Sequence, residues 1–163
     1  YLGLGEILMQ EFDYAEAEVA FLRAHTILSN LFAYSLLGVL ARKYRKDLAL
    51  SKTIHEEIQR AYPNKFVSNT ISLAIVYLYE SKNKEAENIL EGVKGKGEHA
   101  LELAAFYSIA RDTQRAYHYL QRCLTAYRAY PAKRRQILEY VQRDEDFTNL
   151  RGYLLFQKLV KQK

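Results

Sequence analysis

Four histidines and a single cysteine are the side chains of this chain best suited to metal binding or nucleophilic chemistry. None of the histidines has a second His, Cys or carboxylate at ligand spacing on one helical face with a third ligand nearby. His118 and Cys123 are five residues apart, which places them on different faces of a helix. The other histidines, His25, His55 and His99, lie in separate regions. The sequence therefore predicts no catalytic residue, no metal and no cofactor.

The glycine-rich stretch at residues 92–97, Gly-Val-Lys-Gly-Lys-Gly, could also do chemistry, because glycine loops can hold phosphates. It lacks the four-residue spacer and the Lys-Ser/Thr pair of a phosphate-binding loop, and it follows an expected helix, where such a loop would follow a strand. We therefore interpret it as a turn. The single cysteine, Cys123, excludes an internal disulfide and is predicted to be a small buried residue.

Positive charge is concentrated in the last third of the chain. Residues 108–163 contain 12 Lys and Arg against 5 Asp and Glu, whereas residues 1–107 contain 12 against 14. A basic face can bind nucleic acid, an anionic membrane or an acidic partner, although a short basic run is also typical of a solvated helix face. Tyrosines interleave with the arginines, which keeps RNA binding open. The candidate basic surface consists of Arg111, Arg115, Arg122, Arg128, Lys133, Arg134 and Arg135.

A repeated pattern of large and small residues runs through most of the chain and predicts the elements that hold these side chains. Its first copy is Tyr-Leu-Gly-Leu-Gly-Glu-Ile-Leu at residues 1–8, followed by Ala17 and Phe21, and Asp13 is expected to be the N-cap of the second helix. Residues at i, i+3, i+4 and i+7 share one face of a helix, and a small residue in the middle of that face lets a second helix approach closely. The later copies are Tyr34-x-x-Leu37-Gly38 with Leu50-x-x-x-Ile54, Thr70-x-x-Leu73-Ala74 with Ala86-x-x-x-Leu90, and Ala100-x-x-Leu103-Ala104 with Ala116-x-x-x-Leu120.

This pattern resembles the tetratricopeptide repeat, a helix-turn-helix unit of about 34 residues with the pattern W-x2-L-G-x2-Y, then A-x3-F, then P. The resemblance extends from Tyr1 to about Tyr127. It implies an all-α fold, a right-handed α-solenoid of antiparallel helix pairs, in a single domain over residues 1–163. The expected repeats are about 1–30, 31–63, 64–96 and 97–130, followed by capping helices at 131–163.

Two places depart from the repeat, and the end of the chain needs a cap. Leu50 stands where a small residue is expected, so we expect Ser51 to supply the small position with a slight shift. The third repeat is short, and its second helix is expected to be truncated before the glycine-rich turn. An array needs a cap to stay soluble, although the same side chains could instead engage a partner. The expected capping residues are Phe147, Leu150, Phe156 and Leu159.

In tetratricopeptide arrays the first helix of each repeat lines the concave face, so the resemblance implies a ligand groove beside the Leu-Gly pairs. These positions are mostly apolar here, which favours an amphipathic helix or an apolar extended segment as ligand. The Lys, Asn and Arg of the family's carboxylate clamp are absent from them. The superhelix itself, or the end of the chain, is an alternative occupant. The expected groove residues are Leu2, Glu6, Phe32, Ser35, Val39, Arg42, Ile71, Ile75, Leu78, Tyr79, Glu98, Leu101, Ala105 and Ser108.

These observations predict a non-enzymatic scaffold that binds another protein, and nucleic-acid or anionic-surface binding through the basic last third is the alternative. Homo-oligomerisation also stays open. No apolar run approaches the length of a membrane span, and we expect a cytoplasmic protein. Because the sequence starts at Tyr1 inside an expected helix, we expect a fragment of a longer protein, whose N-terminus could carry a leader, an anchor, further repeats or an enzymatic domain.

Overall fold

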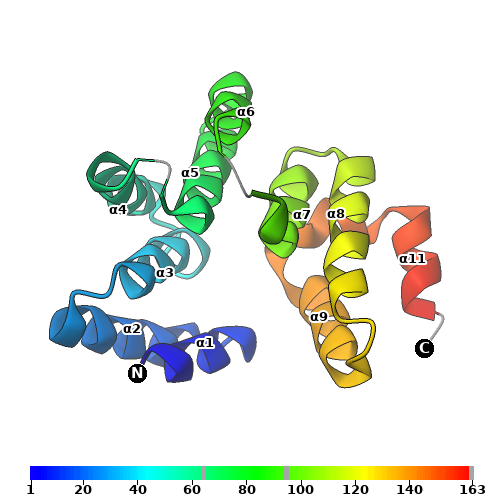
Figure 1. Ribbon diagram of the computed structural model, residues 1–163, viewed down its shortest axis with the longest axis horizontal. Coiled ribbons are helices and arrows are strands. Elements are labelled where there is room, and N and C mark those ends of the chain that lie inside the picture. The colour runs from blue at the N-terminus through cyan, green and yellow to red at the C-terminus, as the bar shows by residue number, and fades with distance from the viewer. Residues whose placement is uncertain (64, 94–95, 162–163) are drawn as a thin grey trace. The chain divides into compact units, whose positions relative to one another are not determined.

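The computed structural model describes residues 1–63, 65–93 and 96–161, and in these residues the regular structure is helical, without a strand (Figure 1). The expected all-α fold is therefore confirmed. The chain divides into two compact units, Tyr1–Val76 (unit 1) and Tyr77–Lys163 (unit 2), and helix α5 (Val67–Tyr79) contributes residues to both. Each unit has its own cluster of buried apolar side chains.

Unit 1 is a run of helices joined by short turns. Besides α5 they are α1 (Leu2–Gln10), α2 (Tyr14–Leu28), α3 (Leu31–Lys43) and α4 (Leu48–Ala61). Consecutive helices pack against each other: α1 on α2, α2 on α3 and α3 on α4. Apolar side chains of α2, α3 and α4 meet in one core, with Phe21 and Leu40 fully buried at its centre. Helix α3 is therefore packed on α2 through this shared core.

Unit 2 contains longer helices followed by short closing segments. They are α6 (Asn83–Glu91), η1 (Lys96–Glu98), α7 (Ala100–Ile109), α8 (Thr113–Ala126), α9 (Pro131–Arg143), η2 (Glu145–Phe147), α10 (Thr148–Arg151) and α11 (Leu154–Lys161). Helix α6 is short, as expected for the truncated third repeat. Helices α7 and α8 pack against each other, and η2 and α10 pack against α7.

Several turns use the same device, a left-handed residue followed at once by a capping side chain. Phe12, for example, has a φ of 66°, and Asp13 after it accepts a hydrogen bond from the backbone N–H of Glu16 at 3.4 Å. The cap satisfies a backbone donor that the first turn of a helix leaves unpaired. The expected cap at Asp13 is confirmed. The same device is formed by Ser29 with Asn30, Lys46 with Asp47, and Arg111 with Asp112.

The small positions of the repeat pattern are buried in every copy. On the first helices they are Gly5, Gly38, Ala74 and Ala104, and on the second helices Ala17, Ser51, Ala86 and Ala116. Ser51 is fully buried whereas Leu50 is 40% exposed, so the expected shift of one residue in the second repeat is confirmed. The expected packing stripe on α1 is wrong in part, because Tyr1 and Leu4 are 59% and 52% exposed. The Tyr1 ring nevertheless lies beneath the guanidinium of Arg23 on α2, with 5.5 Å between the guanidinium carbon and the ring centroid.

Glycine is required in the first two repeats because a side chain of the second helix fills the space beside it. A Cβ on Gly5 would overlap the ring of the fully buried Phe21. A Cβ on Gly38 would lie 2.7 Å from His55 Nε2 and 3.1 Å from Ile54 Cγ2. A Cβ on Gly3 of the same helix as Gly5 would meet nothing within 4 Å. The close approach is thus specific to the predicted positions.

We predict that Gly5→Ala lowers the free energy of unfolding by about 1–3 kcal/mol, because the new methyl group overpacks against Phe21. Gly3→Ala is the matched control in the same helix and should leave stability unchanged or raise it by up to about 1 kcal/mol through helix propensity. Urea unfolding followed by circular dichroism measures both. Equal effects of the two substitutions would contradict the role assigned to the Gly5–Phe21 contact.

A buried polar network joins α3, α4 and α5. His55 Nδ1 lies 2.7 Å from Asn69 Oδ1, and because an amide oxygen only accepts, Nδ1 carries the proton. Asn69 Nδ2 donates to the backbone carbonyl of His55 at 3.0 Å, and the Ser35 hydroxyl donates to Asn69 Oδ1 at 3.3 Å. Burial, helped by the charge of Arg42, lowers the pKa of His55 from 6.5 to about 4 despite the hydrogen bond to Asn69. The imidazole is therefore neutral at physiological pH.

The shifted pKa of His55 predicts a specific loss of stability in acid. Between pH 6.5 and about 4 the unfolded chain binds a proton that the folded chain does not. The free energy of unfolding should therefore fall by about 1.4 kcal/mol per pH unit, up to about 3 kcal/mol, as the pH falls through this window. His55→Gln removes the titrating ring and should flatten this part of the profile. Urea unfolding at several pH values compares the two proteins, and parallel profiles would refute the assignment.

The last segments of the chain close the core of unit 2. Phe147, Leu150 and Phe156 are buried in that core, and Leu159 packs against it. Asp144 accepts a hydrogen bond from the backbone N–H of Asp146 at 2.9 Å, which supports the turn into η2. The expected capping residues are thus used within unit 2.

Candidate functional site

The predicted groove residues of unit 1 divide into half-buried and buried side chains. Leu2, Glu6, Phe32 and Val39 are half-buried, so part of each remains accessible to a ligand. The remaining predicted residues are buried, and for them the expected role is corrected, because packing between elements of the fold already occupies their side chains. They are Ser35, Arg42, Ile71 and Ile75, with exposed fractions of 0 to 8%.

The polar network explains why sequence reasoning misplaced Ser35. The repeat register puts this residue on the face expected to bind a ligand, but its hydroxyl is used by Asn69. Neither Asn69 nor His55 was expected to matter. Two features of the sequence could have indicated their role. Asn69 is a polar residue at a position that the helical period places on an internal face, and His55 replaces the large apolar residue usual at its position. Two such residues are as consistent with a buried hydrogen bond as with an exposed surface.

The predicted groove residues of unit 2 show the same division. Tyr79 is 46% exposed, Leu78 is half-buried, and Leu101 is half-buried against the unit 2 core. Ala105 and Ser108 are buried, which corrects their expected role. The Ser108 hydroxyl accepts from the backbone N–H of Leu150 at 3.3 Å, and its carbonyl accepts from Asn149 at 2.9 Å. The closing segment of unit 2 therefore occupies this part of α7. Glu98 is exposed.

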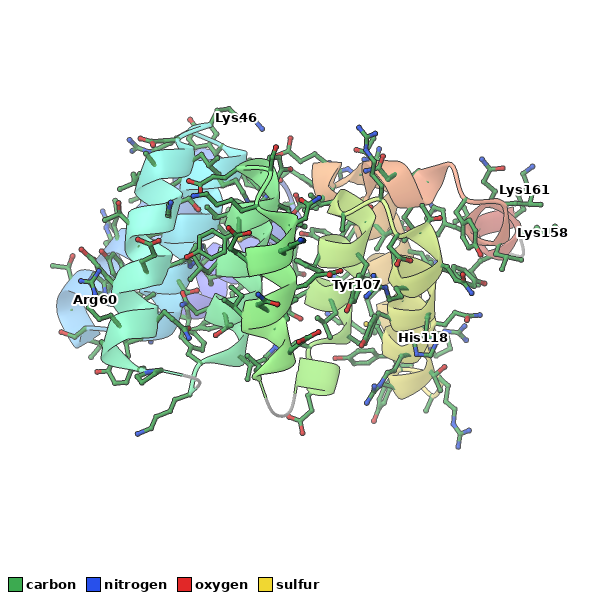
Figure 2. All side chains as sticks on the ribbon, turned by 90° about the horizontal axis from the view of Figure 1, so that it is seen from above. Lys46, Arg60, Tyr107, His118, Lys158 and Lys161 are labelled. Carbon is green, nitrogen blue, oxygen red and sulfur yellow. The ribbon has the colours of Figure 1, made fainter. Side chains whose placement is uncertain are left out.

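The predicted basic residues lie in two groups along α8. Arg111 and Arg115 are at its beginning, whereas Arg128 follows its end and leads to the first turn of α9. A helix of this length spans about 20 Å, so the groups are well separated. The group at the end of α8 also contains Lys133, Arg134 and Arg135, and Arg122 lies in the later part of the helix with its guanidinium beside Gly97. Lys158 and Lys161 on α11 are further exposed cations that were not singled out (Figure 2).

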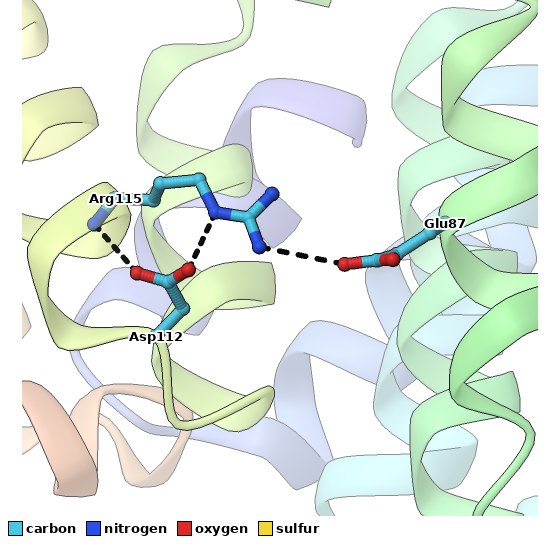
Figure 3. Close-up of polar contacts among 3 residues, drawn as sticks. All are labelled: Glu87, Asp112 and Arg115. Carbon is cyan, nitrogen blue, oxygen red and sulfur yellow. Dashed lines mark hydrogen bonds and ion pairs between the residues drawn. The ribbon is translucent and has the colours of Figure 1, made fainter.

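Arg115 is held by neighbouring groups and is not a free cation. Its Nε donates to Asp112 Oδ2 at 2.5 Å, and its Nη2 lies 3.4 Å from Glu87 Oε1 (Figure 3). Its guanidinium also sits 4.4 Å from the ring centroid of Tyr107. Burial alone would raise the pKa of Asp112, but hydrogen bonds from the Arg115 backbone and side chain bring it below its ordinary value. Hydrogen bonding to Asp112 raises the pKa of Arg115 in turn. Both therefore stay charged, and their charges offset each other.

A shallow hollow of about 430 Å³ lies within unit 2 beside this ion pair. Its wall carries charges of both signs, with Lys84 and Arg111 beside Glu87 and Asp112. His118 is exposed on α8 and is not part of the wall (Figure 2). With Arg115 the wall holds three cations against two carboxylates, so this polar hollow could accept a polar or acidic side chain, and its lining residues include no nucleophile paired with a base.

The remaining candidates for chemistry are isolated from one another. In residues 1–63, 65–93 and 96–161 no group of three or more His, Cys, Asp and Glu side chains could hold a metal ion. Cys123 is buried in the unit 2 core as predicted, and burial raises the pKa of its thiol, so it is not an activated nucleophile.

Comparison with protein-family models, with curated proteins and with solved structures finds no match to this chain. None of the helices in the described residues is both long enough and apolar enough to span a membrane.

Proposed function

We propose that this chain is a non-enzymatic protein-interaction module of the tetratricopeptide type, a right-handed α-solenoid that binds an amphipathic helix or an apolar extended segment of a partner protein. The observation that carries the proposal is the burial of the small positions in every copy of the repeat pattern. Side chains at these positions only pack helices together. Binding must therefore use the residues between them, and those on the first helices are predominantly apolar.

The accessible part of the proposed groove in unit 1 is the half-buried set on α1 and α3. Val39 belongs to this set and is not part of the buried core cluster, so changing it does not open the core. Phe32 also belongs to the set, but its ring is supported by Phe66 at a centroid separation of 6.0 Å. A partially exposed apolar side chain held in place by the fold loses little conformational entropy when a ligand covers it.

We predict that Val39→Glu weakens the binding of a cognate peptide by about tenfold or more, because a carboxylate would be desolvated against an apolar ligand. Peptides selected from a random library on the wild-type protein supply the ligand, and fluorescence anisotropy measures affinity. Leu50→Glu is the matched control, since Leu50 is 40% exposed on the second helix α4.

Circular dichroism checks that both variants are folded. The control should bind as the wild type does. Equal affinity of the wild type and Val39→Glu for every selected peptide would remove α3 from the proposed groove.

A further inference from the structure

Positive charge in unit 2 gathers around the turn that joins α8 to α9 (Figure 1). Residues 113–138 contain six Lys and Arg and no Asp or Glu. One of the six, Arg115, is paired with Asp112 and Glu87 at the start of α8. The other five lie in the later part of α8, in the turn and at the start of α9, and we call them the basic turn. They are Arg122, Arg128, Lys133, Arg134 and Arg135.

The charges of the basic turn are not neutralised by the fold. None of the five cations forms an ion pair with a carboxylate in the part of the chain that the structure describes. Lys133 donates a hydrogen bond to the neutral amide of Gln136 at 3.2 Å, and the buried Nε of Arg134 has no hydrogen-bond partner among the described residues. Two carboxylates lie on the neighbouring segments η1 and α7, Glu98 and Glu102, so cations remain in excess at this end of unit 2.

The position of these cations on α9 opposes the stability of the helix. The helix begins at Pro131, so Lys133, Arg134 and Arg135 follow within its first turns, and its first turn contains no acidic residue. The beginning of a helix carries partial positive charge, which favours acidic side chains there and disfavours basic ones. Packing of α9 uses other side chains, such as Ile137. A bound polyanion would relieve the repulsion that this arrangement creates.

Two exposed tyrosines flank Arg128 within the same turn. Tyr130 is 65% exposed and Tyr127 is 37% exposed, whereas the tyrosines inside α8 and α9 pack against the unit 2 core. The backbone N–H of Tyr130 donates to the carbonyl of Tyr127 at 2.9 Å, and the N–H of Arg134 donates to the carbonyl of Tyr130 at 3.1 Å. The backbone therefore holds two accessible rings among the cations. Bases of a single strand stack on such rings while cations contact the phosphates.

The exposed side chains distinguish between the classes of anionic partner. A membrane-binding surface places Leu, Phe or Trp beside its cations, but the large exposed apolar side chains of residues 113–138 are the two tyrosines. An acidic peptide would pair with the guanidinium groups and would give the rings no stacking partner. The bases of a duplex are already stacked on each other. Unpaired bases use both the rings and the cations, so a single strand fits this surface best.

We propose that the basic turn, together with Tyr127 and Tyr130, binds single-stranded nucleic acid. The rings stack on unpaired bases, and the cations of the basic turn contact the phosphates. Because every base has a face that can stack on a ring, binding depends little on base sequence. This surface belongs to unit 2 and shares no residue with the groove proposed above, so either proposal can fail without the other.

The electrostatic part is tested with fluorescein-labelled oligo-uridine and oligo-thymidine of about 12 nucleotides, a length that covers one binding site. We expect saturable binding to the full chain by fluorescence anisotropy at low salt. The logarithm of the association constant should fall with the logarithm of the salt concentration with a slope of about −2 to −3, as three to four phosphate contacts require. Comparison of the two oligonucleotides shows whether the surface prefers RNA or DNA.

Arg128→Gln, Arg135→Gln removes two exposed cations of the basic turn and should make the salt slope shallower by about 1.4. Lys158→Gln, Lys161→Gln is the matched control, because it removes the same charge from exposed positions of α11 (Figure 2). The control should keep the wild-type slope.

The stacking part is tested with Tyr127→Leu, Tyr130→Leu, which keeps every charge. Affinity for the single strands should fall about tenfold or more, with the salt slope unchanged. Tyr62→Leu is the matched control, since Tyr62 is 42% exposed at the end of α4, and it should bind as the wild type does. Circular dichroism checks that all variants are folded.

Four results would overturn the proposal. They are no binding of either oligonucleotide at low salt, unchanged affinity of the tyrosine double variant, equal loss of affinity in the α11 control, and tighter binding of phosphatidylserine vesicles or oligo-glutamate than of the single strands. The last result would assign the surface to a membrane or to an acidic protein.

Discussion

The close approach of paired helices at a small residue is the constraint on which the rest of the structure depends. At Gly5 and Gly38 the ring of a residue from the second helix occupies the volume that a Cβ would need. This contact fixes how far apart the two helices lie and how each is rotated about its own axis. Once both are fixed, every other side chain of the pair has a determined direction. The division between core, interface and accessible surface follows from it.

The second repeat shows the cost of filling that space with a polar ring. His55 stands where Phe21 stands in the first repeat, with Gly38 beneath it as Gly5 lies beneath Phe21. A buried imidazole needs a partner, and Asn69 of α5 provides it at 2.7 Å. An apolar ring would leave the following helix free to adjust, whereas the hydrogen bonds of Asn69 to His55 set the position of α5 on α4. The polar substitution thus adds a directional restraint to a packing contact.

The sequence was sufficient to predict features that depend on one helix pair. Local spacing and the helical period determine the small positions, the shift from Leu50 to Ser51, the cap at Asp13 and the closing role of Phe147. The groove residues could not be predicted individually. Burial of Ser35 depends on Asn69, which is 34 residues away, and burial of Ser108 depends on a segment about 40 residues away. A periodic pattern predicts on which face of a helix a residue lies, but it does not predict which distant segment packs against that face.

The same reasoning separates the two kinds of surface that a repeat array can offer. A groove surface is formed by residues that do not pack the helices together. The side chains of such a surface can therefore vary without any effect on how the helices pack. A packing surface between helices has a chemistry fixed by the repeat pattern itself, since Leu37, Leu73 and Leu103 occupy equivalent positions and are all buried. Apolar identity alone would make such a surface unselective. Charge at its edge supplies a distinction, as in the ion pair of Arg45 with Glu18 beside the contact of α2 with α3.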